Sequence, residues 1–433
     1  MLKHILWIIV RPVTWTYLKN FYLLGMEHVP NDRPVILASN HPNSFLDGIL
    51  LNHIRFRSVF SMARGDAFKT ALSRFLLKQI NVIPIFRKTE GDLAKNNETF
   101  RYCQEVLFPR NEIVLIFSEG NCVREKRVRP MRKGTARLYF ETLERTGIKP
   151  VIIPVGMNYR YFNRWRNSLI INIGAPINMA PYEEIHQENS ARAVNKFTQD
   201  LFHRVEDQVI AIHRKEDEQL AEQLFEIERN NHPEKASLRV VDDPGVFNRE
   251  KAIANRINHL AEHAPEQLET LKEKASHYFG LLKQYRMTDR MVGKREFNAL
   301  DIIILFFGVL IAPLSWLINY PPFWLARRVA DKKTSPRGVF YDSVLFGSAM
   351  FINALYFLLL LTVAGFFAGW WGVAGMAAFM IFGRAFTLYF LEVWDFFKDW
   401  RVAITKSFDR LDRLKAARSE LLSLLKENRQ VEA

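Results

Sequence analysis

A chain of 433 residues is long enough for two or three domains with separate cores. Its formal charge of +14 comes from 60 basic and 46 acidic residues, and 48% of the residues are hydrophobic, including 34 Phe and 9 Trp. This balance predicts an anionic partner at a bilayer and argues against nucleic acid, because the basic residues lack interleaved aromatics and no nucleic-acid-binding motif is present. The two cysteines, Cys103 and Cys122, argue against a disulfide framework and show no metal-ligand spacing.

Residues 1–24 predict an interfacial membrane helix. The stretch "MLKHILWIIVRP" is too short in its apolar part to span a bilayer, and no small-residue cleavage site follows it. Basic residues surround Trp7 and Trp15, which is typical of a helix lying on a membrane surface. An ordinary amphipathic helix packed against the next domain is the alternative.

Residues 25–180 alternate short β-rich runs with helix-forming stretches. The runs are "RPVILASN", "INVIPIFRK", "EIVLIFSEG", "VIIPVGMNY" and "LIINIGAPI", and each ends in turn residues. Helical patterns such as "DAFKTALSRFLLKQ" and "KGTARLYFETLERTG" lie between them. This alternation predicts an α/β domain with a mixed, partly parallel sheet flanked by helices, whose functional residues cluster in the turns at strand ends.

The rest of the chain predicts a helical region followed by an α-helical membrane region. Residues 181–297 are charged, with one long helix over 191–230 and another over 264–286, joined by a linker that contains Pro and Gly. Residues 298–390 hold three apolar blocks, each close to the ~20 residues that span a bilayer. Residues 391–433 predict a basic amphipathic C-terminal helix.

Charge predicts how the apolar blocks are oriented. The segment "ARRVADKKTSPRG" after the first block carries five basic residues, so we expect it, together with the catalytic domain, at the cytoplasmic face. The second and third blocks are joined by uncharged "AGWWG", which predicts a tight hairpin. The first block would then enter and leave on one side, and Pro313 and the pair Pro321-Pro322 permit a broken, re-entrant helix pair. A straight span is the alternative.

A histidine and an aspartate stand close together in "SNHPNSFLDGILL". The apolar run before His41 predicts a strand, and the following proline pushes His41 into extended geometry at its exit. Asn43 or Ser44 can cap the next helix, which places Asp47 in its first turn. A carboxylate there can fix the imidazole tautomer and leave the other ring nitrogen as a base. The structural alternative is a capping box formed by Ser44 and Asp47.

Two further strand ends carry basic residues. Arg87 ends "NVIPIFR", and "LIFSEGNCVREKRVRPMRKG" runs from a Ser-Glu-Gly turn into a series of cations before Gly134. A planar guanidinium such as that of Arg87 suits a phosphate, and a glycine beside Arg132 and Lys133 allows close backbone approach to an anion. A solvated or lipid-facing loop is the alternative for the basic series.

Together these stretches resemble, in order and spacing, the four motifs of the glycerophospholipid acyltransferase family, which includes lysophosphatidate and glycerol-3-phosphate acyltransferases. The resemblance covers roughly residues 25–177 and rests on "SNHPNSFLD", "NVIPIFR", "FSEG" and "VIIPVGMNY". Five residues rather than the usual four separate His41 from Asp47, as in some glycerol-3-phosphate or dihydroxyacetone-phosphate acyltransferases. Ser118 replaces the usual proline of the third motif, and its Thr-Arg sequel is absent, so that Arg124 would supply the cation.

The resemblance implies transfer of an acyl group from a thioester, either acyl-CoA or acyl carrier protein, to a hydroxyl of a glycerol phosphate. His41 would take the hydroxyl proton and Asp47 would stabilise the imidazolium, without a metal or other cofactor. The residues expected to contact the substrate are Asn43, Ser44, Arg87, Glu119, Gly120, Arg124, Arg132 and Lys133.

The expected acceptor is 1-acylglycerol 3-phosphate, approached from a phospholipid bilayer, with glycerol 3-phosphate or dihydroxyacetone phosphate as the alternative. Two other classes stay open. A catalytically inactive membrane scaffold would have no reason to keep both His41 and Asp47, and a hydrolase would not need the basic residues near them.

Overall fold

The fold is described by a computed structural model that covers residues 2–52, 58–86, 94–162, 164–234, 237, 239–293, 299–336, 338–405 and 408–427. The chain divides into two compact units. The first comprises Met1–Ile210, Ser237–Phe247 and Ala326–Phe351, and the second comprises Ala211–Ala236, Asn248–Leu325 and Ile352–Ala433.

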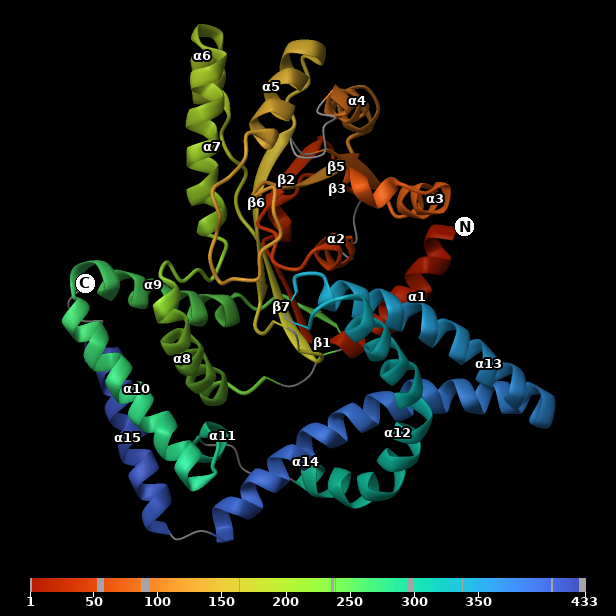
Figure 1. Cartoon of the computed structure of the whole chain (residues 1–433), viewed down its shortest axis with the longest axis vertical. Coiled ribbons are helices and arrows are strands. Elements are labelled where there is room, and N and C mark those ends of the chain that lie inside the picture. Colours follow the sequence, from red (N-terminus) through yellow and green to blue (C-terminus); the bar gives the residue numbers. More distant parts are fainter. Residues whose placement is uncertain are drawn as a thin grey trace. The chain divides into compact units, whose positions relative to one another are not determined.

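The first unit is built on an eight-stranded sheet with the order β4-β3-β5-β2-β6-β7-β1-β8 (Figure 1). The strands are β1 (Leu18–Leu24), β2 (Val35–Ser39), β3 (Val59–Arg64), β4 (Val82–Ile85), β5 (Ile113–Phe117), β6 (Val151–Tyr159), β7 (Asn167–Ile173) and β8 (Val240–Val241). Among these strands only β6 and β7 pair antiparallel. The predicted mixed, partly parallel sheet flanked by helices is confirmed.

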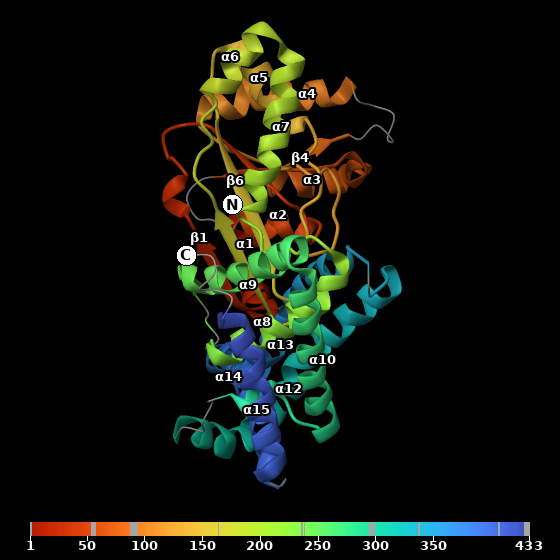
Figure 2. The same cartoon turned by 90° about the vertical axis from the view of Figure 1, so that its left-hand side faces the viewer.

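Helices flank this sheet, as Figures 1 and 2 show. They are α1 (Leu2–Tyr17), α2 (Phe45–Leu51), α3 (Ala71–Gln79), α4 (Ala94–Tyr102), α5 (Gly134–Thr146), α6 (Ala180–Glu188) and α7 (Ser190–Glu206). The apolar runs of the central strands are buried, β2 at every position, because helices on both sides exclude water from a parallel sheet.

The N-terminal segment differs from the prediction. Helix α1 ends at Tyr17, and residues 18–24 form β1, which pairs with β7 and β8. The predicted helix over 1–24 is therefore wrong for residues 18–24. The stretch "LKNFYLL" is rich in aromatic and apolar residues, and β7 offers its backbone a parallel partner. Strand β3, which follows α2, was also not predicted.

The predicted single helix over 191–230 is wrong, because α7 ends at Glu206 and α8 (Glu218–Asn231) begins only after a break. Asn158 of β6 satisfies the backbone at this break. Its Nδ2 donates to the carbonyl oxygen of Gln208 at 3.0 Å, and its Oδ1 accepts from the amide of Ile210 at 2.8 Å. A Cβ at Gly156 would lie only 1.9 Å from the same carbonyl oxygen, so glycine is required there.

The second unit is helical, as predicted for the charged and apolar regions. The helices that lie wholly or partly in it are α8, α9 (Pro244–His263), α10 (Pro265–Tyr285), α11 (Asp289–Val292), α12 (Ala299–Lys333), α13 (Tyr341–Ala378), α14 (Arg384–Thr405) and α15 (Phe408–Glu427). Arg418 of α15 donates to buried Asp289 of α11 at 2.8 Å and to Asn231 at 2.8 Å. This buried network fixes the C-terminal helix to the charged helical region.

The apolar blocks form long helices. By length and composition, two helical stretches, Ala299–Lys333 and Tyr341–Arg401, could cross a membrane. Large apolar side chains are exposed along both, including Leu310 at 75% and Phe366 at 84%. An apolar surface of this kind is typical of a segment covered by lipid or by a partner. The predicted boundary between residues 390 and 391 falls inside α14.

The two turns predicted within the apolar region have different outcomes. The hairpin at "AGWWG" is confirmed, because α13 is interrupted at Ala368 and Gly369, whose φ of +57° favours glycine. The chain then folds back closely, since a Cβ at Gly372 would lie 2.3 Å from the carbonyl oxygen of Ala364. The re-entrant form of the first block stays a prediction: α12 continues as one helix through its three prolines, and Figure 1 shows that this helix is strongly bent and not straight.

Candidate active site

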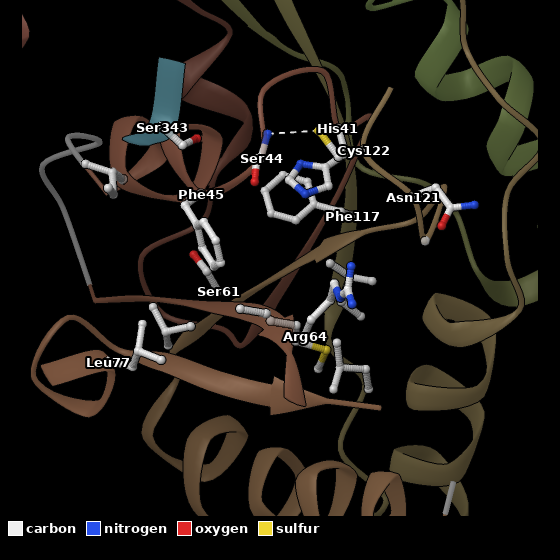
Figure 3. A pocket seen from close by; sticks show the side chains of 18 of the residues that line it. His41, Ser44, Phe45, Ser61, Arg64, Leu77, Phe117, Asn121, Cys122 and Ser343 are labelled. Carbon is white, nitrogen blue, oxygen red and sulfur yellow. Dashed lines mark hydrogen bonds between the residues drawn. The ribbon is translucent and has the colours of Figure 1, made fainter. Parts of the chain in front are cut away.

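The parallel pairing of β2 with β5 brings the first and third motifs together. Ser39 at the end of β2 lies opposite Phe117 at the end of β5, so the turns that follow leave the sheet at the same edge. The imidazole of His41 stacks on the Phe117 ring with centroids 3.7 Å apart (Figure 3). The carbonyl oxygen of His41 accepts from the amide of Val123 at 3.2 Å, which joins the two turns.

Asp47 is fully buried, and three donors hold its carboxylate. Oδ2 accepts from Nδ1 of His41 at 3.0 Å and from the amide of Asn43 at 2.8 Å. Oδ1 accepts from the hydroxyl of Tyr159 at 2.8 Å. The tyrosine cannot share its proton easily, because burial first, and then the Asp47 charge, raise the pKa of Tyr159 well above its usual range. The carboxylate is therefore fixed in position beside the imidazole.

This contact decides the tautomer of His41. An ionised carboxylate only accepts hydrogen bonds, so the proton of the neutral ring lies on Nδ1 and Nε2 carries the lone pair. The predicted pairing of His41 with Asp47 is thus present. The capping-box alternative is not, because Ser44 makes no side-chain cap and has a φ of +49°. The Ser44 amide instead donates to Sγ of Cys122 at 3.0 Å.

Glu119 holds the His41 turn through the backbone. Its Oε2 accepts from the amide of His41 at 3.2 Å, and its Oε1 accepts from the amide of Arg129 at 3.0 Å. Burial raises the pKa of Glu119 to about 7, although both amide hydrogen bonds lower it. This carboxyl group therefore connects the third-motif loop to the His41 turn and does not line the pocket described below.

Asn43 and Arg124 lie in a buried polar cluster rather than in the pocket. Arg124 forms an ion pair with Asp342 at 3.0 Å, and both side chains are at most 6% exposed. Asn43 accepts from Arg124 at 3.3 Å and donates to Asp342 at 3.3 Å. Because Asp342 already neutralises Arg124, this cation is a structural partner of the His41 turn, which the sequence did not indicate.

His41 opens onto a large pocket in the first unit. Its volume is about 1240 Å³, and it is bordered by the predicted residues Ser44, Gly120, Arg132 and Lys133. Gly120 has a φ of +69°, and a Cβ there would lie 3.0 Å from Cγ of Arg132, so glycine lets the Arg132 side chain cross this turn. Arg87 lies outside the described residues.

The pocket has a polar part and an apolar part. Arg64 and Arg137 add two cations that were not predicted. Figure 3 shows Arg64 below His41, with Phe45, Leu77 and Ser343 on one side and Asn121 on the other. Apolar side chains of α2, α3 and residues 339–351 complete the apolar part. The pocket can therefore hold an anionic group and a hydrocarbon chain beside one base.

Several residues escaped the sequence-based prediction. Tyr159 is the last residue of the fourth motif, but nothing in the sequence indicated that its hydroxyl contacts Asp47. Arg64 is the last residue of an unpredicted strand, β3. Asp342 and Ser343 lie about 300 positions after the turn that they contact, at sequence separations of 299 and 300 from Asn43.

Neither cysteine has the properties of a nucleophile. Burial raises the pKa of Cys122, and likewise of Cys103, to about 12, so both are thiols at neutral pH. Within the described residues, no group of three or more His, Cys, Asp or Glu side chains could hold a metal ion.

Comparison with known proteins shows which family model and which solved structure the chain is similar to. Residues 20–158 match the family model described as Acyltransferase. The chain is also similar to the crystal structure of the 1-acyl-sn-glycerophosphate (LPA) acyltransferase PlsC from Thermotoga maritima, with 16% identity and a TM-score of 0.33 over 48% of this chain and 79% of that one. No curated protein matches the chain. At this TM-score the assignment depends on the family model, which matches residues 20–158, the part of the chain that carries His41 and Asp47 and the predicted motifs.

Proposed function

We propose that the protein is a membrane-bound acyltransferase that moves a fatty acyl group from an acyl thioester to the hydroxyl of 1-acylglycerol 3-phosphate. The observation that carries this proposal is the His41 imidazole, which is fixed by buried Asp47 at 3.0 Å and opens onto a pocket with cations and apolar side chains. A base, an anion site and a space for hydrocarbon are what acyl transfer to a lipid phosphate requires.

In the proposed step, Nε2 of His41 removes the proton of the acceptor hydroxyl as the oxygen attacks the thioester carbonyl. The C–S bond of the tetrahedral intermediate then breaks, and the leaving thiolate receives the proton from the imidazolium. The products are an ester and a thiol. General-base help of this kind contributes roughly 10²–10⁴-fold. Asp47 stabilises the imidazolium while it exists, and Tyr159 and the Asn43 amide hold Asp47 in place.

The cations of the pocket support binding of the acceptor phosphate. In the described part of the chain, Arg132 and Lys133 have no carboxylate partner, whereas Arg64 pairs with Asp66 and Arg137 pairs with Glu141. Free cations at a pocket edge can give charge-assisted hydrogen bonds to phosphate oxygens. Arg132 and Lys133 are therefore the proposed phosphate ligands among the described residues.

The apolar part of the pocket favours an acceptor that already carries one chain. Glycerol 3-phosphate has no hydrocarbon to bury, whereas each buried methylene contributes ~0.8 kcal/mol. The long apolar helices α12 and α13 suit a protein that takes such a lipid directly from a bilayer.

The experiment compares two acceptors with purified full-length protein and a labelled acyl thioester. We expect a higher kcat/KM with 1-acylglycerol 3-phosphate than with glycerol 3-phosphate. Arg132→Ala should raise the KM for the acceptor about 10-fold or more, the effect of losing one charged hydrogen bond. Arg145→Ala, which changes an exposed arginine of α5 that pairs with Glu105, is the control. An equal rise in the KM for the thioester would remove the phosphate role of Arg132.

A further inference from the structure

We propose that residues 339–351, which lead into α13 and form its first turns, are a wall of the acyl pocket that sets the length of the chain it accepts. This inference rests on the proposed function. The family match ends at residue 158, so the wall comes from a part of the chain outside the matched acyltransferase domain.

The wall is anchored to the catalytic turn. Oγ of Ser343 donates to the carbonyl oxygen of Asn43 at 3.0 Å and accepts from the amide of Leu46 at 3.2 Å. Asp342 adds its ion pair with Arg124 at 3.0 Å. Asn43 and Leu46 flank Ser44 in the turn that follows His41. The start of α13 is therefore held beside the proposed base.

Aromatic packing fixes the same segment from the other side. The Phe346 ring is fully buried and meets the Tyr17 ring edge-on with centroids 5.7 Å apart. The Phe340 ring lies 6.3 Å from the Phe45 ring, which borders the pocket (Figure 3). A segment held by an ion pair, two hydrogen bonds and two ring contacts is rigid enough to discriminate between chain lengths.

The side chains that this segment turns toward the pocket are mostly apolar. The residues that border the cavity are Val339, Phe340, Ser343, Gly347, Met350 and Phe351. From Ser343 onward they follow the spacing of one helix face, three or four residues apart. A hydrocarbon chain beside His41 would therefore contact one continuous stripe of α13.

Gly347 stands in the middle of that stripe and leaves space open. A Cβ at Gly347 would meet no atom within 4 Å, and its backbone is helical, so the backbone accepts a side chain there and the space around the Cβ position is open. Such a side chain would occupy pocket volume that a long acyl chain needs. Gly347 is thus the position where chain length is most directly adjustable.

The test measures chain-length selectivity of Gly347→Phe in full-length protein. With 1-acylglycerol 3-phosphate held constant, the ratio of kcat/KM for a decanoyl thioester to that for a palmitoyl thioester should rise about 10-fold or more. Gly375→Phe is the matched control, because Gly375 also has no atom near its Cβ position and does not border the pocket. Its ratio should equal that of the wild type.

A second variant tests the opposite direction and guards against misfolding. Met350→Ala enlarges the pocket, so the same ratio should fall. A parallel series keeps the thioester fixed and varies the chain of the acceptor. A shift in the first series places the donor chain at the wall, and a shift in the second series alone places the acceptor chain there. Active variants with unchanged ratios in both series would overturn the proposal.

Failure of the proposed function is distinguishable from failure of the wall. If the wild type transfers no acyl group, the proposed function fails, and the wall is judged by direct binding of fluorescent fatty acids of two lengths. Gly347→Phe should weaken binding of the longer probe about 10-fold more than that of the shorter one. Equal weakening of both probes would overturn the wall as well.

Discussion

At the scale of single residues, the site depends on how completely Asp47 is held. Its three donors come from the first motif and from Tyr159 at the end of β6. The sequence predicted the pairing of His41 with Asp47, because both lie in one motif. It could not predict Tyr159, because the contact depends on the order of strands in the sheet.

Tyr159→Phe tests this support. Loss of the hydroxyl leaves Oδ1 of buried Asp47 without its donor, so the carboxylate is held less firmly beside His41 and kcat should fall about 10-fold, with KM for both substrates nearly unchanged. Tyr182→Phe removes a hydroxyl that binds Asp200 away from the pocket and is the control. A rise in KM with unchanged kcat would contradict this positioning role.

The raised pKa of Glu119 predicts that the stability of the folded protein depends on pH. Because burial raises its pKa in the folded protein from 4.5 to about 7, the folded state binds a proton more tightly than the unfolded state does. Stability from this group is present below about pH 4.5 and is lost as pH rises through about 7. Each pKa unit corresponds to about 1.4 kcal/mol.

Glu119→Gln cannot titrate, so the difference in melting temperature between wild type and variant should change with pH between these two values and level off above them. Thermal unfolding of both proteins across this range measures it. A difference that is constant with pH would show that Glu119 does not titrate as described.

At the scale of elements, the buried pair of Arg124 and Asp342 joins the third-motif loop to α13. Both motif loops follow predicted strands, so their meeting at one sheet edge was predictable from parallel topology. The return of α13 to that edge was not, since its apolar pattern indicated only a membrane helix. The same holds for the break after α7, which depends on Asn158 in a distant strand.

Asp342→Ala should destabilise the first unit strongly. It leaves the Arg124 charge buried without a partner, a change that typically costs about 3–5 kcal/mol. Asp409→Ala removes a carboxylate from an exposed pair with Arg413 and should cost less than about 1 kcal/mol. Melting temperatures of the two variants provide the comparison. Similar small shifts would show that the Arg124 charge has another partner.

At the scale of the whole molecule, the helices that could cross a membrane are continuous with the catalytic unit. Residues 326–351 belong to the unit of the sheet, and α13 begins there before its apolar part. We therefore expect the basic segment after α12 to lie on the same side of a membrane as the sheet, a side that its charge predicts to be cytoplasmic. Fold class was predictable here from composition and periodicity, whereas the continuity of α12 through its prolines was not.

Cysteine labelling tests this arrangement. Ser335→Cys should react with a membrane-impermeant reagent only from the cytoplasmic side, and Trp371→Cys, near the turn between the second and third blocks, only from the opposite side. Sealed cells and inverted vesicles distinguish the two. Labelling of Ser335→Cys in sealed cells would remove the proposed orientation.

The central claim is that His41 is the base of an acyl transfer, and one measurement tests it directly. Purified protein is given a labelled acyl thioester and 1-acylglycerol 3-phosphate, and ester formation is compared between wild type, His41→Ala and His186→Ala. His186, which stacks on Phe140 and does not border the pocket, is the matched histidine control. We predict product from wild type and His186→Ala, and a rate lower by roughly 10²–10⁴-fold for His41→Ala. Equal rates in all three proteins would contradict the account.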